Sequence, residues 1–277
     1  MHLLDSFVLA IVASTPLLLA VEGELLVQRS GIINLGIEGM MLTAAMTSVV
    51  FAQFGGSTIA GFAGGIAGAG LMAALFGIFA IVLKADQIVT GTAINLLALG
   101  VTGFVYREMQ SRQLARGNGD VVVIVAWIVV PIALAFLLWR TIFGLRLRAA
   151  GENPEALTAA KHSVALHRWS ALAMEAVLVG IAGAHLALVL SNGFAENMTA
   201  GRGFIALSIV IFGRWKIRGA LLGTAVFGIA AAAQYALQAS GMGLPFHLLL
   251  AAPYVVTLLI LCGITGRVRA PEALGRS

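Results

Sequence analysis

Long blocks of apolar residues without charge run through most of this 277-residue chain, and they restrict its fold more than any other feature. A helix needs about 20 apolar residues to cross the hydrocarbon core of a bilayer. We find about nine blocks of suitable composition, at approximately residues 7–21, 32–54, 59–83, 88–106, 121–139, 169–190, 203–212, 219–238 and 246–262. The pattern predicts an all-α fold, a polytopic transmembrane helix bundle of about nine segments.

The overall composition excludes an ordinary soluble domain. The chain is 60% hydrophobic and 10% charged, whereas soluble domains carry about 25% charged residues. The net charge of +5 would suggest nucleic-acid binding in a soluble protein. Here the basic residues lie between apolar blocks, as in the cytoplasmic loops of membrane proteins. We therefore expect contact with membrane lipid and none with nucleic acid.

The distribution of basic residues also predicts an orientation. The longest polar stretch, residues 140–168, contains Arg146 and Arg148 and is expected in the cytoplasm. Four later crossings return the C-terminus to the cytoplasm, and five earlier ones place the N-terminus outside. The loop 107–120 then lies outside despite its three arginines. No basic region precedes the first block, so we expect a retained span instead of a cleaved signal peptide.

The rest of the chain shows neither a second domain nor a catalytic motif. No polar stretch is long enough to bury its own core, so residues 1–277 are expected to form a single transmembrane domain. The sequence contains no Gly-Lys-Ser or Gly-Lys-Thr phosphate loop, no metal-ligand spacing of histidines and no Gly-x-Ser-x-Gly motif. We do not expect an enzyme or a bound metal. If ATP drives this protein, a partner must hydrolyse it.

Small residues in the third block predict close helix packing. Gly61, Gly64, Gly65 and Gly68 form two overlapping pairs spaced four residues apart. Such pairs allow helix backbones to approach closely in membranes.

Two polar residues in the second block are candidates for a functional role. Asn34 and Glu38 are four residues apart, so a continuous helix would place them on one face. Charged groups inside spans are rare and mark functional sites. These residues either line a solute pathway or brace an irregular helix near Gly36 and Gly39. The alternative is a carboxylate near the interface that caps a helix or meets Arg29.

Other polar groups within the spans have both structural and functional interpretations. Glu175 could contact a solute, or it could pair with Arg168 or a neighbouring helix. Gln87 and Asn95 are of the uncharged type that commonly joins helices by hydrogen bonds. Asn95 is the best of the uncharged candidates for lining a pore, because it lies in mid-span.

The long polar stretch contains a helix-start signal. Asn153 suits an N-cap, Pro154 the first helical position and Glu155 the first turn. A turn over 151–153 followed by a short helix over about 154–164 is expected. It is either a solvated connection or a docking helix for a cytoplasmic partner.

Three motifs together resemble a known family. The run Ser30-Gly31-Ile32-Ile33-Asn34-Leu35-Gly36-Ile37-Glu38-Gly39-Met40-Met41 resembles the signature of permeases in the branched-chain amino acid, ribose and nucleoside ABC importer superfamily. The run Arg148-Ala149-Ala150-Gly151-Glu152-Asn153-Pro154-Glu155-Ala156 is similar to the start of its coupling helix. The runs Gly201-Arg202-Gly203-Phe204-Ile205-Ala206-Leu207 and Ile211-Phe212-Gly213-Arg214-Trp215 resemble its second-half motif. The first motif is most similar to the nucleoside and simple-sugar branch.

The resemblance implies a set of roles and partners. It implies a multi-pass inner-membrane subunit with an internal two-half pseudo-repeat, working by alternating access. It also implies cytoplasmic ATPase subunits that use ATP and Mg, a second and different permease chain, and an extracytoplasmic solute-binding protein. The residues expected to form the translocation pathway are Asn34, Glu38, Met41 and Asn95. Those expected to couple to the ATPase are Gly151, Glu152, Asn153, Pro154, Glu155 and Ala160.

Other functions stay open at this stage. A secondary transporter driven by an ion gradient could use Glu38 and Glu175 as relay carboxylates. A membrane-embedded enzyme is disfavoured, since no clustered His, Asp and Glu set is evident. Nucleosides, purine bases and simple sugars are all compatible solutes.

Overall fold

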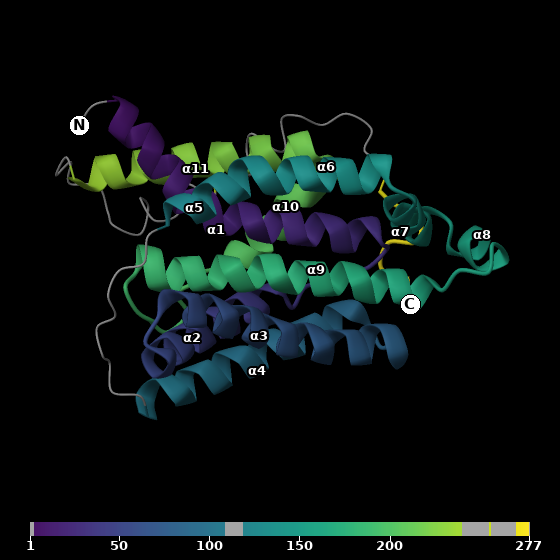
Figure 1. Ribbon diagram of the computed structural model, residues 1–277, viewed down its shortest axis with the longest axis horizontal. Helices are drawn as coiled ribbons and strands as arrows, with labels where there is room; N and C mark the ends of the chain where they lie inside the picture. Colours follow the sequence, from purple (N-terminus) through teal and green to yellow (C-terminus); the bar gives the residue numbers. More distant parts are fainter. Residues whose placement is uncertain (1–2, 109–118, 240–254, 256–269, 277) are drawn as a thin grey trace.

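The computed structural model describes residues 3–108, 119–239, 255 and 270–276 (Figure 1). Within these ranges every regular element is a helix. The elements are α1 (Leu3–Arg29), α2 (Ile37–Gly55), α3 (Thr58–Gly77), η1 (Ile78–Val82), α4 (Gln87–Glu108), α5 (Asp120–Ile124), η2 (Val125–Val129), α6 (Val130–Arg140), α7 (Ile142–Glu152), α8 (Pro154–Ala159), α9 (Val164–His185), η3 (Leu186–Leu190), α10 (Arg202–Phe212) and α11 (Ile217–Ala239), where η denotes a π-helical turn.

Seven helical units in the described part of the chain are long and apolar enough to cross a membrane. They are Ala10–Arg29, Ile37–Gly55, Thr58–Val82, Gln87–Glu108, Asp120–Arg140, Val164–Leu190 and Ile217–Gln234. They coincide with seven of the nine predicted blocks. The block at 203–212 forms α10, which is too short to span, and the block at 246–262 lies outside the described residues except for 255. The all-helical prediction is confirmed with about seven spans, while the orientation and the pseudo-repeat stay predictions.

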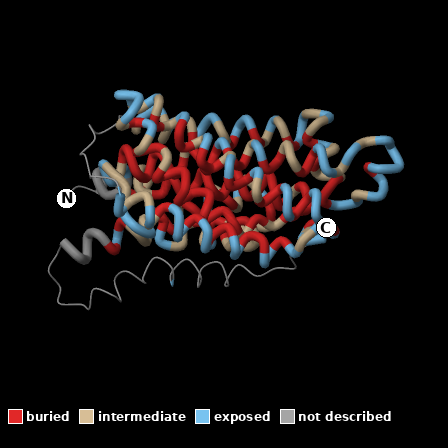
Figure 2. Tube along the Cα trace, turned by 90° about the horizontal axis from the view of Figure 1, so that it is seen from below, coloured by how far each residue is buried: buried red, intermediate tan, exposed pale blue. Residues whose placement is uncertain are grey.

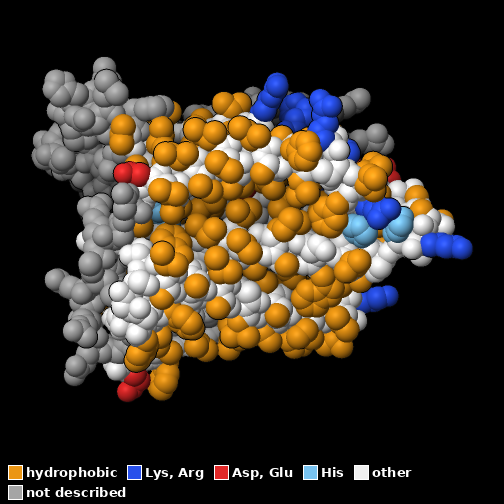
Figure 3. Space-filling view, viewed as in Figure 1, with side chains coloured by type: hydrophobic (Ala, Val, Ile, Leu, Met, Phe, Trp, Pro, Cys, Tyr) orange, Lys and Arg blue, Asp and Glu red, His pale blue; other side chains and the backbone are white. Residues whose placement is uncertain are grey.

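Three helical units form the centre of the bundle. The helices α1 and α2 and the α9–η3 unit are mostly buried, whereas only 33% of the α4 span and 22% of the α5–α6 span are buried. Figure 2 shows the buried residues concentrated along the middle of the bundle. Figure 3 shows hydrophobic side chains covering the middle of one face, as lipid contact requires, and Lys and Arg gathered toward the end where α7 and α8 lie.

The helix α1 extends further than its apolar block predicted. The block was expected to end at residue 21, but the helix continues to Arg29 and includes Glu22 and Glu24. Both carboxylates are buried, at 1% and 0% exposure. Glu24 is compatible with a buried helix because Gln28, one turn later, donates to its Oε1 at 2.7 Å.

The glycines of α3 confirm the predicted close packing. A Cβ atom added at Gly65 would lie 2.7 Å from the carbonyl oxygen of Gly180 in α9. A Cβ atom at Gly64 would lie 2.8 Å from the carbonyl oxygen of Thr47 in α2. The helix α3 therefore contacts two of the central helices, α2 and α9, through its backbone.

Candidate functional site

A break in the helical chain separates α1 from α2 inside the bundle. Residues 30–36, the broken segment, are not helical, and Gly31 has a φ of +93°, a conformation that favours glycine. The expectation that Asn34 and Glu38 share a helix face is wrong, because α2 begins only at Ile37. The alternative that they brace an irregular helix agrees with the contacts described below.

Buried side chains satisfy the backbone groups that the break leaves unpaired. The amide of Ile33 donates to Gln87 Oε1 at 2.8 Å, and the amide of Gly36 donates to Asn34 Oδ1 at 3.0 Å. Asn95 in α4 bridges the end of the break: its Nδ2 donates to the Leu35 carbonyl, and its Oδ1 accepts from the Gly39 amide, both at 2.8 Å. Non-helical backbone at membrane depth is stable only when its polar groups are satisfied in this way.

Glu38 connects the N-termini of two helices. It lies in the first turn of α2, and its carboxylate accepts from the backbone amides of Gly201 at 2.8 Å and Gly203 at 2.6 Å. The hydroxyl of Thr199 donates to the same carboxylate at 2.6 Å. Gly201 is the N-cap of α10 and has no side chain to act as a cap. Glu38 therefore supplies the cap of α10 from another helix, at the positive ends of two helix dipoles.

A second cluster joins the broken segment to α1 and α9. Asn34 Nδ2 donates to Glu175 Oε2 at 2.7 Å, and the Asn34 amide donates to Glu24 Oε1 at 3.4 Å. Glu24 and Glu175 are both fully buried, at 0% exposure. Because Glu175 lies near the middle of the span Val164–Leu190, the cluster lies deep in the bundle.

Sequence reasoning missed the residues that extend this cluster toward the α10–α11 turn. Trp215 Nε1 donates to Gln28 Oε1 at 2.6 Å, and Arg29 Nε donates to the Trp215 carbonyl at 2.9 Å. Arg214 and Trp215 both have positive φ, at 58° and 52°, which is uncommon for residues other than glycine. The one available signal was the spacing of Glu24 and Gln28, which lie one turn apart if α1 is extended past residue 21.

All four residues expected in the translocation pathway are buried within this chain. Asn34 and Met41 are 0% exposed, and Glu38 and Asn95 are 7% exposed. The three polar ones bond to other segments of the chain as described above. Met41 belongs to the hydrophobic core. The structure therefore brings Asn34, Glu38 and Asn95 together around one break.

The residues expected to couple to an ATPase lie together at one end of the bundle. Asn153 caps α8, accepting from the Ala156 amide at 2.9 Å, and Pro154 occupies the first helical position. Both features confirm the predicted start of this helix. Two details differ from the prediction, and the first is the end of the helix. The helix α8 ends at Ala159 instead of about residue 164, because Lys161 adopts a positive φ of 62°.

The second difference concerns the residues before Asn153, which were expected to form a turn. Gly151 and Glu152 end a separate helix, α7, and Glu152 Oε1 lies 3.8 Å from Arg29 Nη1. Gly151 is buried, whereas Glu155 and Ala160 are exposed. Figure 1 shows α8 projecting beyond the end of the bundle.

The fold and the site define a class of protein. Membrane spans combined with helices that begin at breaks inside the bundle are typical of transport proteins, which use such breaks at their pathways. Among the described residues, no three His, Cys, Asp or Glu side chains gather as metal ligands.

Comparison with known sequences identifies the family. The model of the branched-chain amino acid transport system permease component matches residues 6–264. The chain belongs to this family, whose members are non-catalytic membrane subunits of ABC transporters in the cytoplasmic membrane. Family membership implies an ATPase subunit and a solute-binding protein, and it favours an ABC permease over the ion-driven secondary transporter considered above.

Several curated relatives are similar over nearly their whole length. The chain is 34% identical to the guanosine ABC transporter permease protein NupQ of Bacillus subtilis (strain 168), covering 96% of this chain and 93% of the relative. It is also 34% identical to the nucleoside ABC transporter permease protein NupC of Lactococcus lactis, with the same coverage. The putative glucose ABC transporter permease protein TsgC13 of Haloferax volcanii is 33% identical over 84% of this chain and 77% of the relative. No solved structure matches the chain with statistical significance.

Proposed function

We propose that this chain forms half of the translocation pathway of an ABC importer for nucleosides or closely related polar solutes, such as purines and simple sugars. The observation that carries the proposal is the similarity, over 96% of the chain, to relatives named as guanosine and nucleoside permeases. The putative glucose permease among the relatives is the reason to keep simple sugars as the second solute class.

The partners in this proposal follow from the family and from the position of α8. A pair of cytoplasmic ATPase subunits uses ATP and Mg, a second and different permease chain supplies the other half of the pathway, and an extracytoplasmic protein delivers the solute. The exposed residues of α8 are available to the ATPase, while Leu157, 4% exposed, anchors the helix to the bundle. The orientation with α8 in the cytoplasm and the N-terminus outside belongs to the same proposal.

The buried polar residues have a bracing role in this mechanism. Asn34, Glu38 and Asn95 hold the broken segment and the start of α10 in one arrangement. Alternating access requires parts of the bundle to move relative to each other around the pathway. Helix ends joined by buried hydrogen bonds move together, so these residues transmit movement between α2, α4 and α10.

The experiment uses uptake in the native cell. The gene for this chain is deleted, and the strain is complemented with the wild type or with a double variant, Ala156→Arg with Thr158→Arg, on the exposed face of α8. The matched control is Ala156→Ser with Thr158→Ser at the same positions. Uptake of radiolabelled guanosine, adenosine, ribose and glucose is measured together with the amount of protein in the membrane fraction.

We expect the deletion to abolish nucleoside uptake and the wild type to restore it. The arginine variant should insert normally but lower uptake at least about tenfold, because two large cations on α8 obstruct docking of a partner. The serine variant should behave like the wild type. Loss of glucose or ribose uptake alone would move the assignment to sugars, and unchanged uptake of all four solutes would refute the proposal.

A further inference from the structure

Residues 270–276 return to the bundle beside the start of α8. The amide of Ala273 donates to the carbonyl of Gly151 at 2.9 Å, and the amide of Gly275 donates to the carbonyl of Gly31 at 3.0 Å. The first bond reaches the last turn of α7, and the second reaches the broken segment. The 270–276 segment therefore links the end of α7, next to α8, to the broken segment between α1 and α2.

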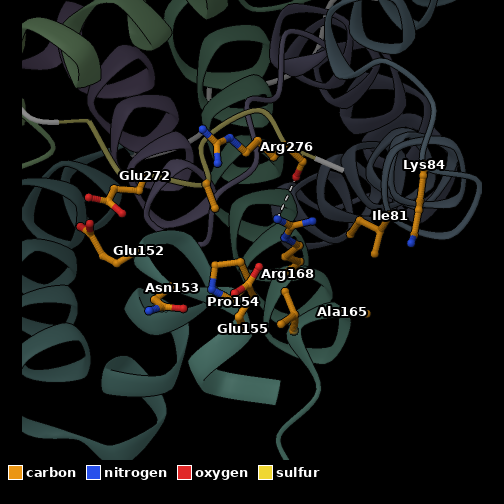
Figure 4. Close-up of a pocket in the computed structure, with 12 residues that line it drawn as sticks. Ile81, Lys84, Glu152, Asn153, Pro154, Glu155, Ala165, Arg168, Glu272 and Arg276 are labelled. Atoms are coloured by element: carbon orange, nitrogen blue, oxygen red, sulfur yellow. Dashed lines mark hydrogen bonds between the residues drawn. The ribbon is translucent and has the colours of Figure 1, made fainter. Parts of the chain in front are cut away.

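A third bond attaches the segment to α9. Arg168 Nη2 donates to the carbonyl of Arg276 at 2.9 Å, and Figure 4 shows this bond at the edge of a cavity of about 600 Å³. Arg168 is 8% exposed, so it is held within the bundle. All three bonds use backbone atoms of the 270–276 segment, which makes them independent of its side-chain rotamers.

The backbones at this junction are packed without space for side chains. A Cβ atom at Gly31 would lie 3.2 Å from Gly151 Cα and 3.4 Å from the Ala273 carbonyl oxygen. A Cβ atom at Gly151 would collide with the Arg29 carbonyl oxygen. Ala273 itself is 3% exposed. Direct backbone contact is stiff, because no rotatable side chain lies between the segments.

A cavity separates the start of α8 from the 270–276 segment. It lies between the start of α8, with Asn153, Pro154 and Glu155, and the 270–276 segment, with Glu272 and Arg276 (Figure 4). The start of α8 is therefore not packed directly on the 270–276 segment along this side. Besides the buried Leu157, the connection of α8 to the bundle passes through α7 at Gly151, which bonds to the 270–276 segment.

We propose that the 270–276 segment is a positioning element for the coupling helix. It fixes the end of α7 against the broken segment and α9, so that displacement of α8 by an ATPase moves the broken segment instead of flexing the α7–α8 connection. The inference rests on the proposed function, because it assumes that α8 is the helix on which the ATPase acts.

The test measures solute imported per ATP hydrolysed, in proteoliposomes that contain the complete transporter purified from its own cell. Ala273→Pro removes the amide that bonds to Gly151. Gly275→Val places a β-branched residue at a φ of +77°, which such residues avoid. Gly275→Asn is the matched control, since asparagine tolerates this conformation. Membrane content and copurified ATPase are measured for each variant.

We expect Ala273→Pro and Gly275→Val to lower the import per ATP about fivefold or more, with ATP hydrolysis and assembly maintained, and Gly275→Asn to stay within about twofold of wild type. A structural role alone would lower import and hydrolysis together and leave their ratio unchanged. A ratio equal to wild type in both test variants would overturn the inference. A wild-type chain without an associated ATPase would instead overturn the proposed function.

A measurement on the wild type keeps the inference testable if the variants do not assemble. Hydrogen exchange of the complete transporter should show the amides of Ala273 and Gly275 protected at least about a hundredfold relative to an unstructured peptide. Exchange at the rate of an unstructured peptide would contradict a segment held by these bonds.

Discussion

At the scale of single residues, Glu38 performs a task that α10 cannot perform for itself. Gly201 at the N-cap has no side chain, and the amides of Gly201 and Gly203 both point at the Glu38 carboxylate. Hydrogen bonds to a charged group contribute about 1.5–3 kcal/mol each. A Cβ atom at Gly203 would lie 2.7 Å from Glu38 Cα, so glycine is required for this approach.

Glu38→Ala should destabilise the protein by about 2–4 kcal/mol, because it leaves the buried Gly203 amide, the partly buried Gly201 amide and the Thr199 hydroxyl without their acceptor. Glu38→Gln should cost less, since one acceptor oxygen remains. Thermal unfolding of the detergent-purified protein measures the difference. Glu108→Ala, at an exposed carboxylate, is the control and should stay within about 0.5 kcal/mol of wild type. Equal effects of the two alanine variants would contradict the capping role.

Glu175 gives a second prediction at this scale. Glu175→Gln should change stability by less than about 1 kcal/mol, because the amide oxygen of glutamine still accepts from Asn34 Nδ2. Glu175→Leu should destabilise by about 1–3 kcal/mol, since Asn34 Nδ2 then loses its buried carboxylate partner. The same unfolding assay compares the two variants. A leucine variant as stable as the glutamine variant would show that the bond to Asn34 contributes nothing.

At the scale of elements, the break before α2 is organised by side chains from several helices. Gln87 and Asn95 belong to α4 and Glu24 to α1, and each bonds to backbone of residues 33–39. Helix α3 is held differently, by direct backbone packing through glycines that carry no side chain. These two kinds of contact, polar bonds and backbone packing, are the main interactions between apolar helices in lipid.

Two glycines of α3 allow a matched test of that packing. Gly65→Leu should prevent α3 from approaching α9, because even a Cβ atom would lie 2.7 Å from the Gly180 carbonyl oxygen. Gly70→Leu should be tolerated, since nothing lies within 4 Å of a Cβ atom at that position. The fraction of monodisperse protein after detergent extraction is the measurement. Equal losses for both variants would show that helix composition matters more than the α3–α9 contact.

At the scale of the whole molecule, the helix α8 and the Arg107–Glu196 ion pair lie at opposite ends of the bundle. α8 precedes the N-terminus of α9, whereas Arg107 at the end of α4 pairs at 3.3 Å with Glu196, which follows η3. The α9–η3 unit of 27 residues therefore separates the two ends, by about 40 Å at 1.5 Å per residue. Figure 1 shows the end of α4 and the helix α8 at opposite sides of the molecule.

This arrangement predicts opposite accessibility for two engineered cysteines. In a Cys262→Ser background, Glu108→Cys should react with a membrane-impermeant maleimide in intact spheroplasts. Thr158→Cys should react only after permeabilisation, because the basic end is expected in the cytoplasm. Labelling is read by mass shift. Reaction of both cysteines from the same side would refute the proposed orientation.

The sequence by itself determined the helical membrane fold, the positions of most spans and the start of α8. These features depend on local physics: lipid requires about 20 apolar residues per crossing, and the Asn153 cap bonds only three residues ahead. The polar residues inside the spans were also evident as exceptions to the apolar pattern. Their partners were not, since Glu38 bonds to residues more than 160 positions away, and the 270–276 segment bonds to Gly151 and Gly31.

Only the tertiary structure decided what those residues do. The periodicity that placed Asn34 and Glu38 on one helix face failed because the backbone groups of residues 33–35 bond to side chains of α1 and α4 and need no helix of their own. The same reason carried α1 past Glu24, because its buried carboxylate accepts from Gln28 and from the Asn34 amide, which offsets the cost of burial. Local sequence sets where helices can form, and long-range contacts determine where they break and what their polar residues hold together.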